Sequence, residues 1–126
     1  MRAICERAET WASAPPAQGG REAYDVVTAR AVGRLATLAE LASPLLREGG
    51  ALVAWKGRRD AEEEAELERA GERLGMRSEE VRAAGRESGY ENRHLHLIRK
   101  TGPTPSDLPR RPGIAKKRPF GRRSSV

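Results

Sequence analysis

The chain has 126 residues, enough for one ordinary domain and too few for two, and only 4% of them are aromatic, so its core must be lean. The single cysteine, Cys5, excludes an intramolecular disulfide and fits a reducing cytosol. No stretch approaches the roughly 20 apolar residues of a membrane span, and the first residues lack the apolar core of a signal peptide. We therefore expect a cytoplasmic protein that does not enter a membrane.

The formal charge of +6 is unevenly distributed along the chain. Residues 1–92 carry 14 Lys and Arg against 17 Asp and Glu, whereas residues 93–126 carry 10 Lys and Arg against one acid, Asp107. A basic C-terminal segment of this kind favours a polyanionic partner, most commonly a nucleic acid. A solvated tail that only keeps the protein soluble would have the same composition.

The first half of the chain has the pattern of two strands and a helix. A short strand is expected over 2–6, a Pro- and Gly-rich loop over 13–21, and a strand over 23–29. The near-continuous apolar run of the latter is typical of a strand that is covered on both faces. Apolar residues then recur with a helical period over 35–46, and Gly49 and Gly50 are suited to a left-handed C-terminal cap.

A second buried strand is expected over 51–56, and a helix from Asp60 to about Leu74 that Gly75 ends. Asp60 and Glu63 have the spacing of a capping box. We interpret the acidic run 62–64 as a solvated first turn that complements the helix dipole. A weak strand over 76–87, a turn at 88–92 and a stronger strand over 93–100 predict a hairpin. The prolines after Thr101 predict an extended or partly disordered tail without regular structure.

This order of elements predicts an α/β fold with a mostly parallel sheet. In such sheets ligands bind beyond the carboxyl ends of the strands. Arg30 follows the strand over 23–29, Lys56 ends the next strand, and Glu9 follows the first one. We therefore expect these three side chains on one rim of the sheet.

Three short segments follow the expected strands: "RAE" at 7–9, "TARAV" at 28–32 and "WKG" at 55–57. Together with "LATLAELASPLLREGGALVAWKG", "NRHLHLIRKT" and "PTPSDLPRRPGIAKKRP", they resemble the C-terminal half of the bacterial small-subunit ribosomal RNA guanine-N7 methyltransferases, the family also called glucose-inhibited division protein B. The resemblance extends from about Ile4 to about Pro119. It implies an incomplete Rossmann-like class I methyltransferase sheet with a C-terminal antiparallel hairpin over 1–101, and a Pro-rich basic tail over 102–126.

The resemblance also implies a function, which is S-adenosylmethionine-dependent methylation of N7 of one guanine in 16S ribosomal RNA. The partner would be this RNA or the small ribosomal subunit, with no DNA and no membrane. By position in the matching motifs, the cofactor would be contacted by Ala8, Glu9 and Arg30. The side of the site toward the RNA would be lined by Arg7, Lys56 and Arg93. No catalytic acid–base pair is implied, since N7 of guanine carries no proton at neutral pH.

One motif of the family does not occur in the 126 residues. It is the G-x-G-x-G-x-P-G-type loop, whose backbone amides approach the methionine end of the cofactor. We therefore expect the chain to be a fragment that does not methylate alone. Because the strand that the loop follows would pair with the strand over 23–29, we also expect the latter to be an exposed edge that is prone to association.

Other interpretations stay open. The chain could be a non-catalytic basic module that binds ribosomal RNA, or a class I methyltransferase with another substrate. His94 and His96 share one face of their strand at a spacing that suits a metal, but no third ligand accompanies them, so a metal site is disfavoured. Trp55 and Tyr90 could stack on a base, although packing is the simpler role for Trp55 inside its strand.

Overall fold

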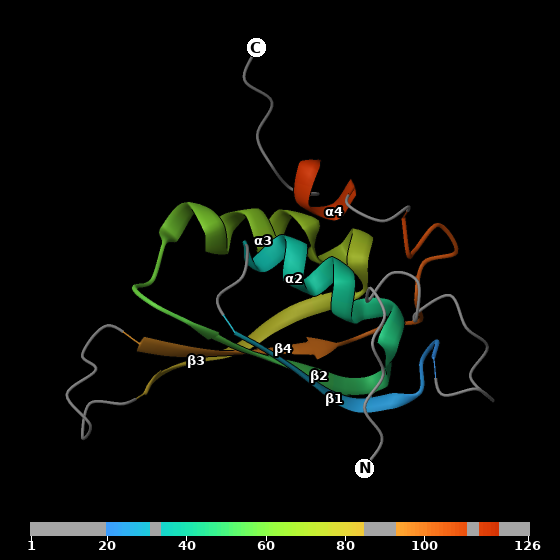
Figure 1. Cartoon of the computed structure of the whole chain (residues 1–126), viewed down its shortest axis with the longest axis horizontal. Helices are drawn as coiled ribbons and strands as arrows, with labels where there is room; N and C mark the ends of the chain where they lie inside the picture. Colours follow the sequence, from blue (N-terminus) through green and yellow to red (C-terminus); the bar gives the residue numbers. More distant parts are fainter. Residues whose placement is uncertain (1–19, 31–33, 85–92, 111–113, 119–126) are drawn as a thin grey trace.

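The computed structural model describes residues 20–30, 34–84, 93–110 and 114–118, which form one four-stranded sheet with helices on one face (Figure 1). The α/β class is therefore confirmed. The expected strand over 2–6 and the turn at 88–92 lie outside the described residues. In chain order the elements are β1 (Tyr24–Arg30), α2 (Leu35–Ala42), the 3-10 turn η2 (Ser43–Leu45), β2 (Leu46–Lys56), α3 (Ala61–Leu74), β3 (Met76–Ala84), β4 (Arg93–Lys100) and α4 (Ile114–Lys117).

The sheet has the strand order β1-β2-β4-β3. β1 and β2 are parallel, whereas β4 is antiparallel to both β2 and β3, which confirms the C-terminal antiparallel hairpin. The expectation of a mostly parallel sheet is wrong for the described strands, because only the pairing of β1 with β2 is parallel. The register pairs Arg30 with Trp55, and Lys56 with His94. The ends of β1 and β2 and the start of β4 therefore meet at one edge of the sheet, which we call the rim (Arg30, Lys56, Arg93 and His94).

The core lies between the sheet and the helices α2 and α3, which lie side by side on it (Figure 1). Each helix contributes the apolar stripe that its sequence period predicts. Each large aliphatic side chain buried here contributes about 1.5–3 kcal/mol. The largest apolar side chains of this core are Leu35, Leu46, Leu52, Leu67, Leu74, Met76 and Ile98.

The opposite face of the sheet is not covered by any of the described helices (Figure 1). Val26 is 56% exposed and Trp55 is 43% exposed, while Val27 and Ala29 of β1 pack against the core. The expectation that β1 is covered on both faces is therefore wrong for the described residues, as is the packed role of Trp55. Within the described sheet β1 is an edge strand, as expected.

The helix α2 is shorter than its pattern suggests, and β2 is longer. Proline lacks a backbone N–H and fits only the first turn of a helix, and Pro44 opens the 3-10 turn that ends α2. β2 then begins at Leu46, so Gly49, with its φ of 89°, lies inside a strand. The expected glycine cap of α2 is therefore wrong.

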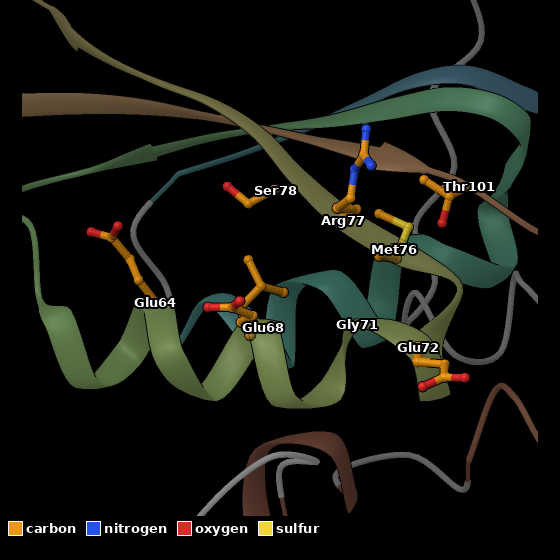
Figure 2. Close-up of a pocket in the computed structure, with 9 residues that line it drawn as sticks. Glu64, Glu68, Gly71, Glu72, Met76, Arg77, Ser78 and Thr101 are labelled. Carbon is orange, nitrogen blue, oxygen red and sulfur yellow. The ribbon is translucent and has the colours of Figure 1, made fainter.

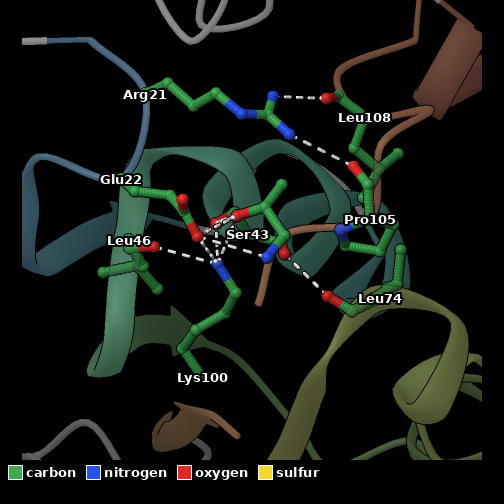
Figure 3. A network of polar contacts seen from close by, with 9 residues as sticks. Arg21, Glu22, Ser43, Leu46, Leu74, Lys100, Pro105 and Leu108 are labelled. Atoms are coloured by element: carbon green, nitrogen blue, oxygen red, sulfur yellow. Dashed lines mark hydrogen bonds and ion pairs between the residues drawn. The ribbon is translucent and has the colours of Figure 1, made fainter. Parts of the chain in front are cut away.

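A buried lysine takes the place of that cap (Figure 3). Lys100 is only 1% exposed. Its ammonium donates hydrogen bonds to the carbonyl oxygens of Ser43 (2.6 Å) and Leu46 (2.9 Å) and to Thr104 Oγ1 (2.7 Å), with the Glu22 carboxylate at 3.8 Å. Burial lowers the pKa of Lys100 to about 8.

The tail continues from this lysine and packs back on the domain. Arg21 donates hydrogen bonds to the carbonyl oxygens of Leu108 (2.5 Å) and Pro105 (3.2 Å) (Figure 3). Arg110 forms an ion pair with the buried carboxylate of Glu40. Part of the tail's positive charge therefore serves the fold.

The tail also contains a single helical turn, α4, which packs against α2 (Figure 1). Thr37 Oγ1 donates a hydrogen bond to the Ala115 carbonyl at 3.1 Å. The expectation that the tail lacks any regular element is therefore wrong at this turn. None of the helices in the described part of the chain is both long and apolar enough to span a bilayer.

Lys100 makes the stability depend on pH in a defined direction. Its pKa is about 8 in the folded chain and 10.5 as the ordinary value. Between these pH values the unfolded chain binds more protons than the folded one, so the free energy of unfolding rises with pH, by up to about 3 kcal/mol. Urea unfolding from pH 7 to 10.5 should show this rise in the wild type and not in Lys100→Met. Parallel curves for the two proteins would contradict the role of Lys100.

Candidate functional site

The rim brings together the three described residues that the sequence placed at the site, but on two faces of the sheet. Side chains alternate along a strand. Arg30, Trp55 and Arg93 therefore lie on the face without described helices, where all three are exposed. Lys56 lies on the helix face, in the same alternating set as the buried Ala54. Ala8, Glu9 and Arg7 lie outside the described residues, and so does Tyr90.

A carboxylate from α3 organises the helix face of the rim. Glu63 Oε1 is 2.7 Å from Lys56 Nζ and accepts a hydrogen bond from the backbone N–H of Leu35, also at 2.7 Å. Leu35 is the first residue of α2, and Arg34 before it provides no side-chain cap. One of the unsatisfied N–H groups at the start of α2 is thus capped from a neighbouring helix.

A second carboxylate of α3 holds the residue before α2. Arg34 Nε donates a hydrogen bond to Glu66 Oε1 at 2.7 Å, and Glu66 is only 2% exposed. The bond to this carboxylate, more than the cost of partial burial, raises the pKa of Arg34. Two carboxylates of α3 therefore hold both the end of β2 and the start of α2.

Sequence analysis missed Glu63 and Glu66 as site residues. The capping-box prediction is half correct, because Asp60 Oδ1 accepts a hydrogen bond from the Glu63 backbone N–H at 3.1 Å. The Glu63 side chain, however, bonds to Leu35 and Lys56 instead of reaching back to Asp60. The description of the acidic run as solvated is wrong for Glu63, which is buried. The sequence did contain a sign that Glu63 is buried, since Glu63 lies four residues before Leu67 and therefore on the same face of α3.

A buried histidine of β4, His96, lies near the first turn of α3. His96 is 2% exposed, and its Nδ1 has no hydrogen-bond partner among the described residues. Burial lowers the pKa of His96, and the nearby carboxylates of Glu64 and Glu63 partly oppose this shift. His94, at the rim, has its Nδ1 2.9 Å from the Gly57 carbonyl oxygen. The part of the chain that the structure describes contains no group of three or more potential metal ligands.

A cavity of about 710 Å³ lies between α3 and β3, away from the rim (Figure 2). One wall carries Glu64, Glu68 and Glu72 of α3, and Arg77 and Ser78 of β3 lie opposite. None of the rim residues lines it. Its acidic wall would repel the phosphates of a nucleic acid, so the cavity is not a candidate for an RNA contact.

His96 predicts a loss of stability in acid. Because its pKa in the folded chain lies below the ordinary value of 6.5, the unfolded chain takes up a proton first as the pH falls. The contribution of His96 is therefore present above pH 6.5 and is lost below it. Chemical denaturation between pH 5 and 8 should show a steeper decline for the wild type than for His96→Leu, and equal slopes would contradict this assignment.

The sequence of the chain matches a known protein family. The model of the family described as rRNA small subunit methyltransferase G (GidB) matches residues 1–96. Three proteins named ribosomal RNA small subunit methyltransferase G are similar to the chain. The one from Symbiobacterium thermophilum is 50% identical over 100 residues, which are 79% of this chain and 41% of that protein.

Two relatives from Thermotoga match more of the chain. The protein from Thermotoga sp. (strain RQ2) is 42% identical over 95% of this chain and 50% of its own length. The protein from Thermotoga neapolitana is 44% identical over 93% of this chain and 48% of its own length. The chain thus spans half or less of the length of these relatives. Because the family model covers residues 1–96 of 126, the chain belongs to the rRNA small subunit methyltransferase G family.

Proposed function

We propose that the chain is part of an S-adenosylmethionine-dependent enzyme that methylates N7 of a guanine in 16S ribosomal RNA. Family membership over residues 1–96 is the observation that carries this proposal. The small ribosomal subunit or its RNA would be the partner, and the cytoplasm, where ribosomes assemble, would be the place of action. The rim supports the proposal, since ligands of parallel α/β sheets bind beyond the carboxyl ends of the strands.

The described part of the rim fits such a cofactor in its chemistry. Arg30 is exposed at the end of β1, and no ion pair of its guanidinium occurs among the described residues. It can therefore bind a carboxylate, as the methionine end of the cofactor presents. Glu9 would accept hydrogen bonds from hydroxyl groups, because an ionised carboxylate is purely an acceptor. Ala8 would complete the contacts that this chain provides.

The proposed reaction requires the enzyme to position its substrates and does not require acid–base catalysis. When bound, S-adenosylmethionine supplies a methyl group on a sulfonium centre. The lone pair of guanine N7 carries no proton at neutral pH, so no general base is required. The residues of the chain would hold the base in line with the methyl group and exclude water. Arg7 and Arg93 would bind phosphates, Lys56 would line the site from the helix face of the rim, and the remaining tail cations would add salt-dependent affinity.

A chimera tests the proposed activity. The part of the Symbiobacterium relative that precedes its match to this chain would be joined to residues 1–126 and expressed in a bacterium that lacks its own enzyme. The expected result is N7-methylguanosine in 16S ribosomal RNA, measured by mass spectrometry of the digested RNA. Arg30→Gln in the chimera should lower the apparent affinity for the cofactor. A folded chimera that binds 16S ribosomal RNA but leaves it unmethylated would favour the non-catalytic alternative.

We expect the 126-residue polypeptide by itself to bind S-adenosylmethionine more weakly than micromolar. Its sequence contains no G-x-G-type loop whose backbone amides could approach the cofactor. Isothermal titration calorimetry of the purified polypeptide measures this directly, and the chimera serves as the positive control. Micromolar binding by the polypeptide would show that the remaining contacts suffice.

A further inference from the structure

The ammonium of Lys56 is engaged within the protein. Its side chain is 14% exposed, and that of Glu63 is 11% exposed. The same carboxylate oxygen that lies 2.7 Å from Lys56 Nζ accepts the Leu35 amide. A cation held this way has its charge balanced from inside the fold, so a phosphate gains less by approaching it than by approaching an exposed arginine.

We infer that Glu63 is a positioning residue of the rim, and that Lys56 acts there as an internal brace and not as a phosphate contact. Glu63 joins the end of β2 to the first turn of α2 through its contacts with Lys56 and the Leu35 amide. In the sequence, α2 begins five residues after Arg30. Glu66 adds the bond to Arg34 at the same place. The carboxylates of α3 thereby hold the end of β2 against the start of α2, while the pairing of β1 with β2 places Arg30 beside Trp55. The consequence for RNA rests on the proposed function, whereas the brace does not.

The first test concerns the brace alone and uses the full 126-residue chain. Acetylation with a water-soluble N-hydroxysuccinimide ester, followed by mass spectrometry, compares Lys56 with Lys117, which is exposed on α4. In the wild type Lys56 should react roughly tenfold more slowly, because its ammonium is largely shielded from water and forms an ion pair with the Glu63 carboxylate. Equal rates in the wild type would overturn the inference without any variant.

Variants sharpen the same test. In Glu63→Gln, Lys56 should approach the reactivity of Lys117, and the Leu35 amide should exchange its hydrogen roughly tenfold faster. Glu68→Gln is the matched control, since Glu68 lies on the same helix with an exposed side chain. It should change neither value. Circular dichroism would verify that the variants are folded, and an unchanged Leu35 exchange rate in folded Glu63→Gln would overturn the inference.

The second test concerns RNA and measures the salt dependence of binding to a 16S ribosomal RNA transcript. Removing a phosphate contact lowers the slope of log K against log salt by about one. Arg93→Gln should show this loss, and Lys56→Gln less than half of it. Glu63→Gln should raise the slope by releasing Lys56, and the double variant Glu63→Gln/Lys56→Gln should abolish that gain. A purely structural role of Glu63 would not produce a gain that depends on Lys56.

The outcomes separate the inference from the proposed function. If the chain does not bind the RNA, the proposed partner fails, while the acetylation and exchange data still decide whether Glu63 braces Lys56. If the chain binds RNA and Lys56→Gln loses as much slope as Arg93→Gln, Lys56 is a phosphate contact and the inference is overturned.

Discussion

The carboxylate of Glu63 is the constraint on which the helix face of the rim depends. A buried carboxylate is tolerated only where hydrogen bonds and opposite charge compensate its lost hydration. Lys56 and the Leu35 amide provide this compensation at 2.7 Å each. In return the carboxylate holds together two segments that are distant in sequence. The arrangement explains why α2 can begin at Leu35 although Arg34, the residue before it, provides no side-chain cap.

A second buried cation has the corresponding role at the opposite end of the sheet. Lys100 donates hydrogen bonds to the carbonyl oxygens of Ser43 and Leu46, at the two ends of the 3-10 turn that follows α2, and Thr104 accepts a hydrogen bond from the same ammonium. α2 is thus held by an anion at its first turn and by a cation near its last, as the helix dipole favours. The basic character of the chain is therefore divided between charges that build the fold and charges that remain exposed, such as Arg30 and Arg93.

The sequence predicted those features that depend on local pattern. Alternation of apolar residues predicted the strand β4, and the capping residues Asp60 and Gly75 predicted both ends of α3. The order of the strands predicted that Arg30 and Lys56 lie at the same end of two parallel strands. The sequence did not predict features that depend on distant partners. The burial of Glu63 depends on Lys56 and Leu35, and the hydrogen bonds that replace the expected glycine cap come from Lys100, which lies 57 residues from Ser43. The family resemblance supplied the expected roles of the rim residues, but it could not show that they divide between two faces.

An energetic coupling between Lys56 and Glu63 is required if Glu63 holds Lys56 at the rim. A double-mutant cycle with Lys56→Met, Glu63→Gln and the double variant measures it from the free energies of unfolding in urea. We expect a coupling of about 1 kcal/mol or more, because either single change removes the ion pair while the other group stays largely shielded from water. If the two changes are additive within about 0.3 kcal/mol, the residues act independently, and Glu63 does not brace the rim.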